Sequence, residues 1–157
     1  MRAFLVSALG LILAAALQAA LGEQFAIGWA RPDFILTVAA VLAVHRTSDG
    51  ASLTGFFAGL LQGGVMNSHM AAFVISRTLG CLSAERISAA FVGRTYVTVG
   101  VACMVASILS AVLYLFVGVP GTIVGWLLAM AGGAVYNSIL AALLYSAYRA
   151  IIRPANP

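Results

Sequence analysis

The chain has 157 residues, of which 63% are hydrophobic and only 8% are charged, and its mean hydropathy is +1.09. A composition this apolar leaves too little polar surface to cover a water-soluble globular protein. We therefore expect a single membrane domain over residues 1–157 with no separate catalytic module. The net charge of +4 comes from eight arginines, scattered one or two at a time along the sequence. They form no basic face, which argues against nucleic acid as a partner.

Six apolar stretches separated by polar breaks predict six membrane-spanning helices, that is, an all-α integral membrane protein built as a helix bundle. The first stretch also resembles a secretory signal, but its apolar run is closer to the roughly 20 residues of a span than to the 7–15 of a signal core, so we predict a retained helix. The predicted spans are Ala3 to Leu21, Pro32 to Val44, Ala51 to Met66, Met70 to Leu82, Tyr96 to Val117 and Thr122 to Tyr145.

The second, third and fourth of these spans are short, and the third and fourth are also rich in small residues. As a helix, residues 51–66 reach only about 24 Å across a hydrocarbon core about 30 Å thick. Local thinning of the bilayer, a broken helix, or burial against longer neighbours would each accommodate the mismatch.

The arginines predict the orientation of the bundle. With six spans, both chain ends lie on the same side of the membrane. If that side is the cytoplasm, Arg31 is the only arginine between or beside the spans that lies outside, in agreement with the positive-inside rule. We therefore predict a multi-pass membrane protein with both termini in the cytoplasm. The arginines assigned to the inside are Arg2, Arg46, Arg86, Arg94, Arg149 and Arg153.

Small residues recur every four positions in two of the predicted spans. Such stripes let helix backbones approach closely, so they indicate helix packing against a neighbouring span or a partner's helix. The stripe in the third span contains Ala51, Gly55, Gly59 and Gly63, and the stripe in the sixth contains Gly121, Gly125, Ala129 and Gly133.

No reactive constellation is evident. Asp33 and Asp49 fall at opposite ends of the second span and its exit, so they do not form an aspartyl dyad. His69 beside Ser68, and His45 at the inner surface, lack a neighbouring acid and are interpreted as structural. The two cysteines lie inside apolar stretches, and we predict no metal, no cofactor and no enzymatic activity.

Arg77 is the unusual residue, because it lies seven positions after Met70, roughly 10 Å into the fourth span, where a cation needs compensation. Candidate partners are Gln62, Asn67, carbonyl groups of the Gly-rich stretch, and Asn137. Arg77 is then either a structural clasp or a direct contact to a ligand or partner helix, and the pattern leaves both readings open.

The segment from Arg31 to Leu82 contains RPDFILTVAAVLAV, then GASLTGFFAGLLQGG, then SRTLGCL after a turn. In this order the segment resembles the MreD family, with a Pro-Asp that opens the second span and a G-F-x-x-G-L-x-Q core in the third. The chain departs from the family at Gly63 and Gly64, where an acidic residue commonly follows the Gln. The matching positions are Pro32, Asp33, Gly50, Gly55, Phe56, Gly59, Leu60 and Gln62.

This resemblance implies a rod-shape-determining protein, a non-enzymatic membrane scaffold of the cell-elongation and peptidoglycan-synthesis machinery. Its partners would be an MreC-like bitopic membrane protein and, nearby, MreB, RodA and a class B penicillin-binding protein. The family fold is similar to the substrate-binding subunits of energy-coupling-factor vitamin transporters, which makes such a subunit the alternative. Few polar side chains are available to build a vitamin pocket, and this shortage favours the protein-binding scaffold.

Overall fold

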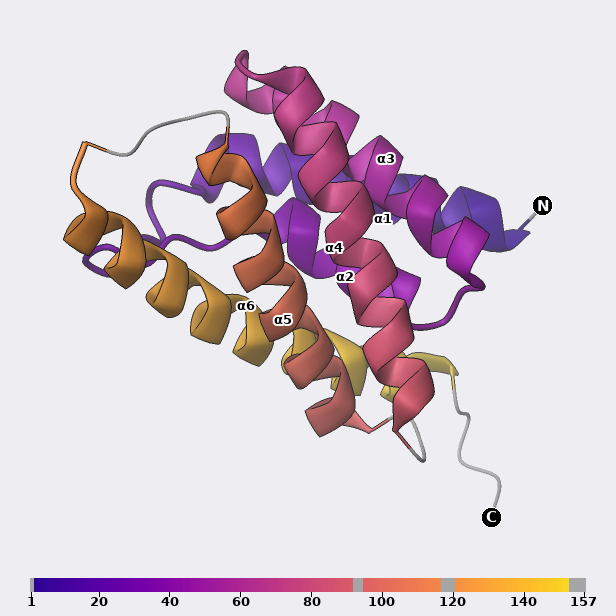
Figure 1. Ribbon diagram of the computed structural model, residues 1–157. Helices are drawn as coiled ribbons and strands as arrows, with labels where there is room; N and C mark the ends of the chain where they lie inside the picture. Colours follow the sequence, from indigo (N-terminus) through magenta and orange to yellow (C-terminus); the bar gives the residue numbers. More distant parts are fainter. Residues whose placement is uncertain (1, 92–94, 117–120, 153–157) are drawn as a thin grey trace.

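The computed structural model describes residues 2–91, 95–116 and 121–152, and these form helices with no β-strand (Figure 1). Arg94 and Arg153, which the sequence assigns to the inside, lie outside the described residues. An all-helical chain with six helices in the described part agrees with the predicted class. The helices are α1 (Arg2–Leu21), α2 (Phe34–Ala43), α3 (Ser48–Met66), α4 (Met70–Ala90), α5 (Tyr96–Leu115) and α6 (Ile123–Ile152).

Helix α2 is the centre of the bundle (Figure 1). It packs against each of the other five helices, and none of its side chains is exposed. The core around it is rich in alanine, as at Ala39, Ala40 and Ala43, so neighbouring helices approach its backbone closely. With only 10 residues, α2 is about 15 Å long. Burial against longer neighbours therefore accounts for the one helix that is far too short to cross a bilayer.

Contacts between helix ends show that successive helices alternate in direction. At one end of the bundle Arg46 Nη2 donates to Ser7 Oγ at 2.6 Å, and the ring of His45 stacks on Tyr145 and Tyr148 with centroids 5.5 Å apart in each pair. The beginning of α1 and the last turns of α6 therefore lie at the same end as the α2–α3 connection. At the opposite end, the ring of His69 before α4 meets that of Tyr114 near the end of α5.

Within the described residues, two segments are long and apolar enough to cross a membrane by length and composition: Tyr96–Leu115 in α5 and Ile123–Arg149 in α6. Shorter apolar helical segments are Leu5–Leu21 and Phe34–Ala43. Outside the core, five of the six helices expose large apolar side chains, α2 being the exception. A continuous apolar periphery of this kind is suited to lipid or to other helices and not to water.

The prediction that the third and fourth spans are short is wrong. Helix α3 has 19 residues and α4 has 21, which correspond to about 28 Å and 31 Å. The predicted spans ended where polar residues begin, but helical backbone continues through them. The side chain of Thr47 caps α3 ahead of Ser48 and Asp49, and α4 runs on through Glu85 and Arg86 to Ala90.

The glycine stripe of α3 packs against α4 of the same chain. A Cβ added at Gly55 would lie 2.4 Å from the carbonyl oxygen of Arg77, and one added at Gly59 would lie 2.4 Å from Cα of Val74. Gly63 meets Met70 in the same way, at 2.9 Å from its Cα. The two backbones are therefore nearly in contact along α3, and this stripe is not available to a partner's helix. Asn67 and His69, with φ of 47° and 43°, make the tight turn between the two helices.

Candidate functional site

The site is organised by the residue that precedes α2. Asp33 is the N-cap of this helix, and its Oδ1 accepts a hydrogen bond from the backbone N–H of Leu36 at 2.8 Å. Pro32, immediately before it, is buried, and its ring fixes the backbone on entry to the helix. The cap satisfies an N–H group that the first turn of a helix leaves without a partner. Because α2 is short and central, its capped end lies inside the bundle.

The second carboxylate oxygen of Asp33 forms an ion pair with Arg77 of α4. The side chains are 19% and 9% exposed, so the pair lies inside the protein. The guanidinium carbon of Arg77 also lies 5.7 Å from the ring centroid of Phe73, in cation–π geometry. A buried cation is tolerated when a close counter-charge compensates the lost hydration, and Asp33 supplies that charge. The Asp33 carboxylate therefore both caps α2 and compensates the positive charge of Arg77 in α4.

Two amide side chains connect this pair to other helices. Asn137 in α6 accepts a hydrogen bond from the backbone N–H of Asp33 at 2.9 Å and donates one to Ser107 Oγ of α5 at 3.2 Å. Gln18 in α1 donates to the carbonyl of Pro32 at 3.2 Å and accepts from the N–H of Phe34 at 2.8 Å. The polar groups at the start of α2 thus bind α1, α4, α5 and α6 together.

A cavity of about 380 Å³ opens beside the ion pair, between α2, α4, α5 and α6. Aromatic rings of Phe73, Tyr114 and Trp126 line the cavity. Its polar lining comes from Arg31, Asp33, Ser76, Arg77, Ser107, Ser110 and Asn137. The small residues Ala129 and Gly133 of α6 face this space. The nearest heavy atom to a Cβ added at Gly133 is the Arg31 carbonyl oxygen, at 3.6 Å, so the α6 stripe borders the cavity and the segment before α2.

The predicted polar cluster is brought together only in part. Arg77 and Asn137 meet through Asp33. Gln62 is buried, but its Oε1 has no hydrogen-bond partner among the described residues. Asn67 is exposed at the turn between α3 and α4, away from the cluster. Of the other motif residues, Gly50 lies in the first turn of α3 and Phe56 is 41% exposed on its outer face.

Asp33 is the functional residue that the sequence interpretation missed as the counter-charge of Arg77. Asp33 caps the start of α2 and Arg77 lies about two turns into α4, and both helices begin at the same end of the bundle. Asp33 is also the only acidic residue of the sequence inside a predicted span. These two signals were enough to suggest the pair. The pair was missed because the sequence places Asp33 at the membrane surface and Arg77 several residues deeper. The depth at which α2 begins depends on tertiary packing and cannot be predicted from the sequence pattern.

The groups around the cavity are suited to binding. Asn137 donates a hydrogen bond to Ser107 Oγ, and no histidine is among the described residues that line the cavity. Within the described ranges no three potential ligands gather as a metal site would require. The cavity combines two guanidinium groups, a carboxylate, hydroxyl groups and aromatic rings, a mixture that holds polar or amphipathic molecules.

Comparisons with family models, with curated proteins and with solved structures gave no match for this chain.

Proposed function

We propose that this protein is a non-enzymatic membrane scaffold of the bacterial cell-elongation machinery, of the MreD type. In this proposal the chain crosses the inner membrane six times with both ends in the cytoplasm. It binds an MreC-like bitopic protein and holds that partner's outer domain near the peptidoglycan synthase. The mechanism is positional, and no bond is made or broken by this chain.

The observation that carries the proposal is that three residues of the family-like motif, Asp33, Gly55 and Gly59, converge on one stretch of α4. Asp33 pairs with the guanidinium of Arg77 from one side, and Gly55 lies against the carbonyl of the same residue from the other. Gly59 packs one turn earlier against Val74. Sequence features some 20 to 45 positions apart therefore have a common structural purpose, which supports reading them as one family signature and not as chance matches.

Two further features support a scaffold in the membrane. The buried charges are compensated within the chain, so the bundle presents a mainly apolar periphery to its surroundings. Helix α6 in particular exposes large side chains along much of its length, including Val124, Leu128, Val135 and Ile139. A long helix with so little of its surface covered is suited to packing against lipid and against a partner's transmembrane helix.

Affinity purification tests this proposal. The tagged chain is extracted from its native membrane in mild detergent, and the proteins that accompany it are identified by mass spectrometry, with an unrelated multi-pass protein carrying the same tag as the control. We expect a bitopic protein with a coiled coil to be enriched together with a penicillin-binding protein, and depletion of the chain to give rounded cells. Normal rods after depletion, with neither protein enriched, would contradict the proposal.

The cavity beside Arg77 favours one second candidate, the substrate-binding subunit of a small-molecule uptake transporter. Its volume of about 380 Å³ falls within the usual range of ligand sites, and charged, hydroxyl and aromatic groups converge on it. Calorimetry of the purified protein with a panel of water-soluble vitamins separates the two candidates. Tight binding of one vitamin, together with co-purification of an ATPase module, would replace the scaffold proposal.

A further inference from the structure

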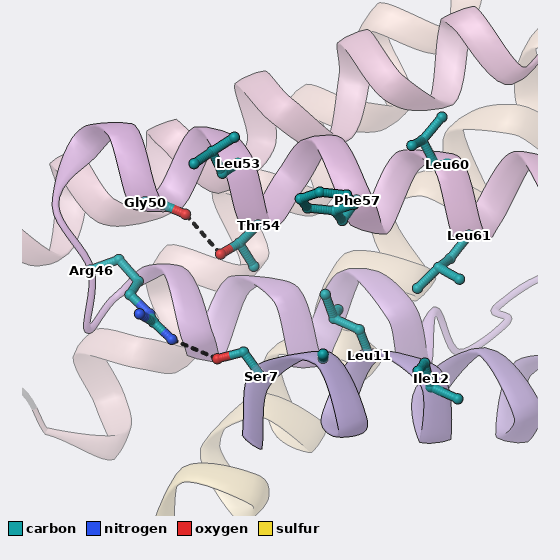
Figure 2. A pocket seen from close by; sticks show the side chains of 11 residues that line it. Ser7, Leu11, Ile12, Arg46, Gly50, Leu53, Thr54, Phe57, Leu60 and Leu61 are labelled. Carbon is teal, nitrogen blue, oxygen red and sulfur yellow. Dashed lines mark hydrogen bonds between the residues drawn. The ribbon is translucent and has the colours of Figure 1, made fainter. Parts of the chain in front are cut away.

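Two spaces in the bundle differ in the chemistry of their walls. A groove of about 490 Å³ runs between α1 and α3 and shares no lining residue with the Arg77 cavity. In Figure 2, Arg46 at one end of this groove donates to Ser7 Oγ, and Thr54 donates to the carbonyl of Gly50. The other side chains that line the groove are apolar. The groove therefore continues the apolar periphery, whereas polar groups from several helices converge on the Arg77 cavity.

The charged groups of the Arg77 cavity are compensated within the chain. Arg77 pairs with Asp33, and Arg31, which also lines the cavity, pairs with Glu23 at 2.6 Å. Each charged side chain among the described lining residues therefore has an opposite charge beside it. A ligand with a net charge would lose its hydration there without gaining a new counter-charge. The lining therefore favours an uncharged ligand.

The hydrogen-bond acceptors around the ion pair are occupied, but donors are left over. The two carboxylate oxygens of Asp33, Oδ1 of Asn137 and Oγ of Ser107 each accept a hydrogen bond from within the chain. By contrast, Nε of Arg77, a side chain only 9% exposed, has no hydrogen-bond partner in the described part of the chain. The hydroxyl of Tyr114, which lines the cavity, forms no hydrogen bond there either. A buried N–H without a partner is costly, so a fitting ligand must supply acceptor atoms.

The cavity is elongated, and aromatic rings line its outer part. Along α6 the lining extends from Trp126 to Asn137, a rise of roughly 16 Å at 1.5 Å per residue. Near the start of α4 and the end of α5, the rings of Phe73 and Tyr114 lie 5.1 Å apart at 32° to each other and form one wall. Gly133 has no side chain to fill the space between Trp126 and Asn137. Aromatic walls of this kind bind flat rings by stacking on them.

An open cleft at the outer end leads to this cavity. The cleft, of about 1070 Å³, lies between the segment before α2 and the beginning of α6, and it shares Arg31, Trp126 and Ala129 with the cavity. The small-residue stripe of α6 continues from the cleft into the cavity. A ligand that arrives from the outer side therefore reaches Arg77 by passing the indole ring of Trp126.

We propose that the Arg77 cavity binds an uncharged, flat ring compound whose carbonyl or ring-nitrogen atoms accept hydrogen bonds from Arg77 and Tyr114. The site goes beyond the scaffold role, and for the uptake candidate it names the class of ligand. Only the route of entry past Trp126 rests on the membrane orientation proposed above. Binding itself depends on the cavity alone.

Saturation-transfer difference NMR of the full chain in detergent micelles tests the ligand class. Nicotinamide and thymine are the uncharged probes, and nicotinate, which has a carboxylate in place of the amide of nicotinamide, is the charged control. We expect at least one uncharged probe to bind with a Kd below about 1 mM, and nicotinate to bind about tenfold more weakly than nicotinamide. Nicotinate binding as tightly as nicotinamide would overturn the proposal, as would the absence of binding by both uncharged probes.

Two pairs of substitutions test the location of the site. Tyr114→Phe keeps the ring and removes the donor, so it should weaken binding about two- to tenfold. Tyr96→Phe should have no effect, because Tyr96 lies at the other end of α5 and does not line the cavity. Gly133→Leu should fill the space and abolish binding, whereas Ala131→Leu, on the exposed face of α6, should not. Helical circular dichroism verifies that each variant is folded, and equal effects within either pair would refute the site.

The outcomes are separate from those of the scaffold proposal. Ligand binding without co-purification of the bitopic partner would contradict only the scaffold role. Co-purification of that partner by a chain that binds neither uncharged probe would contradict only the ligand site.

Discussion

Arg77 shows how one buried charge constrains the whole bundle. Its side chain is 9% exposed, and its counter-charge comes from Asp33, more than 40 positions earlier in the chain. The same carboxylate caps α2. One residue therefore supplies both the hydrogen-bond acceptor that a buried helix start needs and the counter-charge that a buried cation needs. This geometry supports the structural reading of Arg77. The adjoining cavity keeps the ligand reading testable.

At the residue scale, we predict that Asp33→Asn destabilises the protein by about 3–5 kcal/mol. Asparagine keeps the helix cap but leaves Arg77 charged and unpaired away from water. Adding Arg77→Met should recover a large part of the loss, because a buried ion pair can be replaced by apolar groups at little cost. The free energy of unfolding is measured by denaturant titration in detergent micelles.

The exposed ion pair between Arg31 and Glu23 provides the control for this cycle, since its side chains are 64% and 78% exposed. Glu23→Gln should change the free energy of unfolding by no more than about 1 kcal/mol. If Asp33→Asn costs as little as Glu23→Gln, the buried pair does not hold the bundle together as described.

At the element scale, the contact between α3 and α4 depends on glycine. We predict that Gly55→Ala costs at least about 3 kcal/mol, the upper part of the range for overpacked cores. The added Cβ would lie 2.4 Å from a backbone carbonyl oxygen of α4, which cannot move without separating the helices. Unfolding in detergent and the loss of helical circular dichroism on heating measure the effect.

Gly64 is a matched control in the same helix, because a Cβ added there has no heavy atom within 4 Å. Gly64→Ala should be neutral or stabilise α3 by about 0.5–1 kcal/mol, since alanine is the better helix former. A similar penalty at Gly55 and Gly64 would mean that the two helices do not pack as closely as the structure indicates.

The outcome for the two stripes also differs at this scale. The stripe in α3 packs a helix of the same chain, whereas the stripe in α6 borders a cavity. Both have the same four-residue period in the sequence. The four-residue period identifies a helix face made of small residues, but the element that covers this face is decided by the tertiary packing. Because α2 is short, it leaves space for a cavity beside the stripe in α6.

At the scale of the whole molecule, the proposed topology is tested by cysteine labelling. The native Cys81 and Cys103 are both 0% exposed and should not react. In sealed right-side-out membrane vesicles we expect Ser68→Cys, at the exposed α3–α4 turn, to react with a membrane-impermeant maleimide. Arg86→Cys, near the opposite end of α4, should react only after permeabilisation.

Reaction of both engineered cysteines without permeabilisation would show that α4 does not cross the bilayer. Reaction of Arg86→Cys alone would reverse the proposed orientation. In either case the positive-inside interpretation of the arginines would have to be abandoned.

The sequence by itself determined the all-helical class and the number and order of the helices in the described part of the chain. Apolar composition and the spacing of polar breaks act locally, and residues such as Pro32 and Asp33 mark a helix start wherever they stand. It also identified Arg77 as a residue in need of compensation, because the cost of a buried cation does not depend on the fold.

Only the tertiary structure decided which groups compensate Arg77, which stripe packs a helix, and where a cavity stays open. The polar ends of α3 and α4 were excluded from the predicted spans, although flanking contacts such as that between Ser48 and Glu85 support helix there. The physical reason is common to these cases. Helix formation depends mainly on residues that are close in the sequence. The depth of each helix in the bundle, the partner of each buried charge and the element that covers each helix face depend on how the helices are positioned relative to one another. No local sequence pattern specifies those positions.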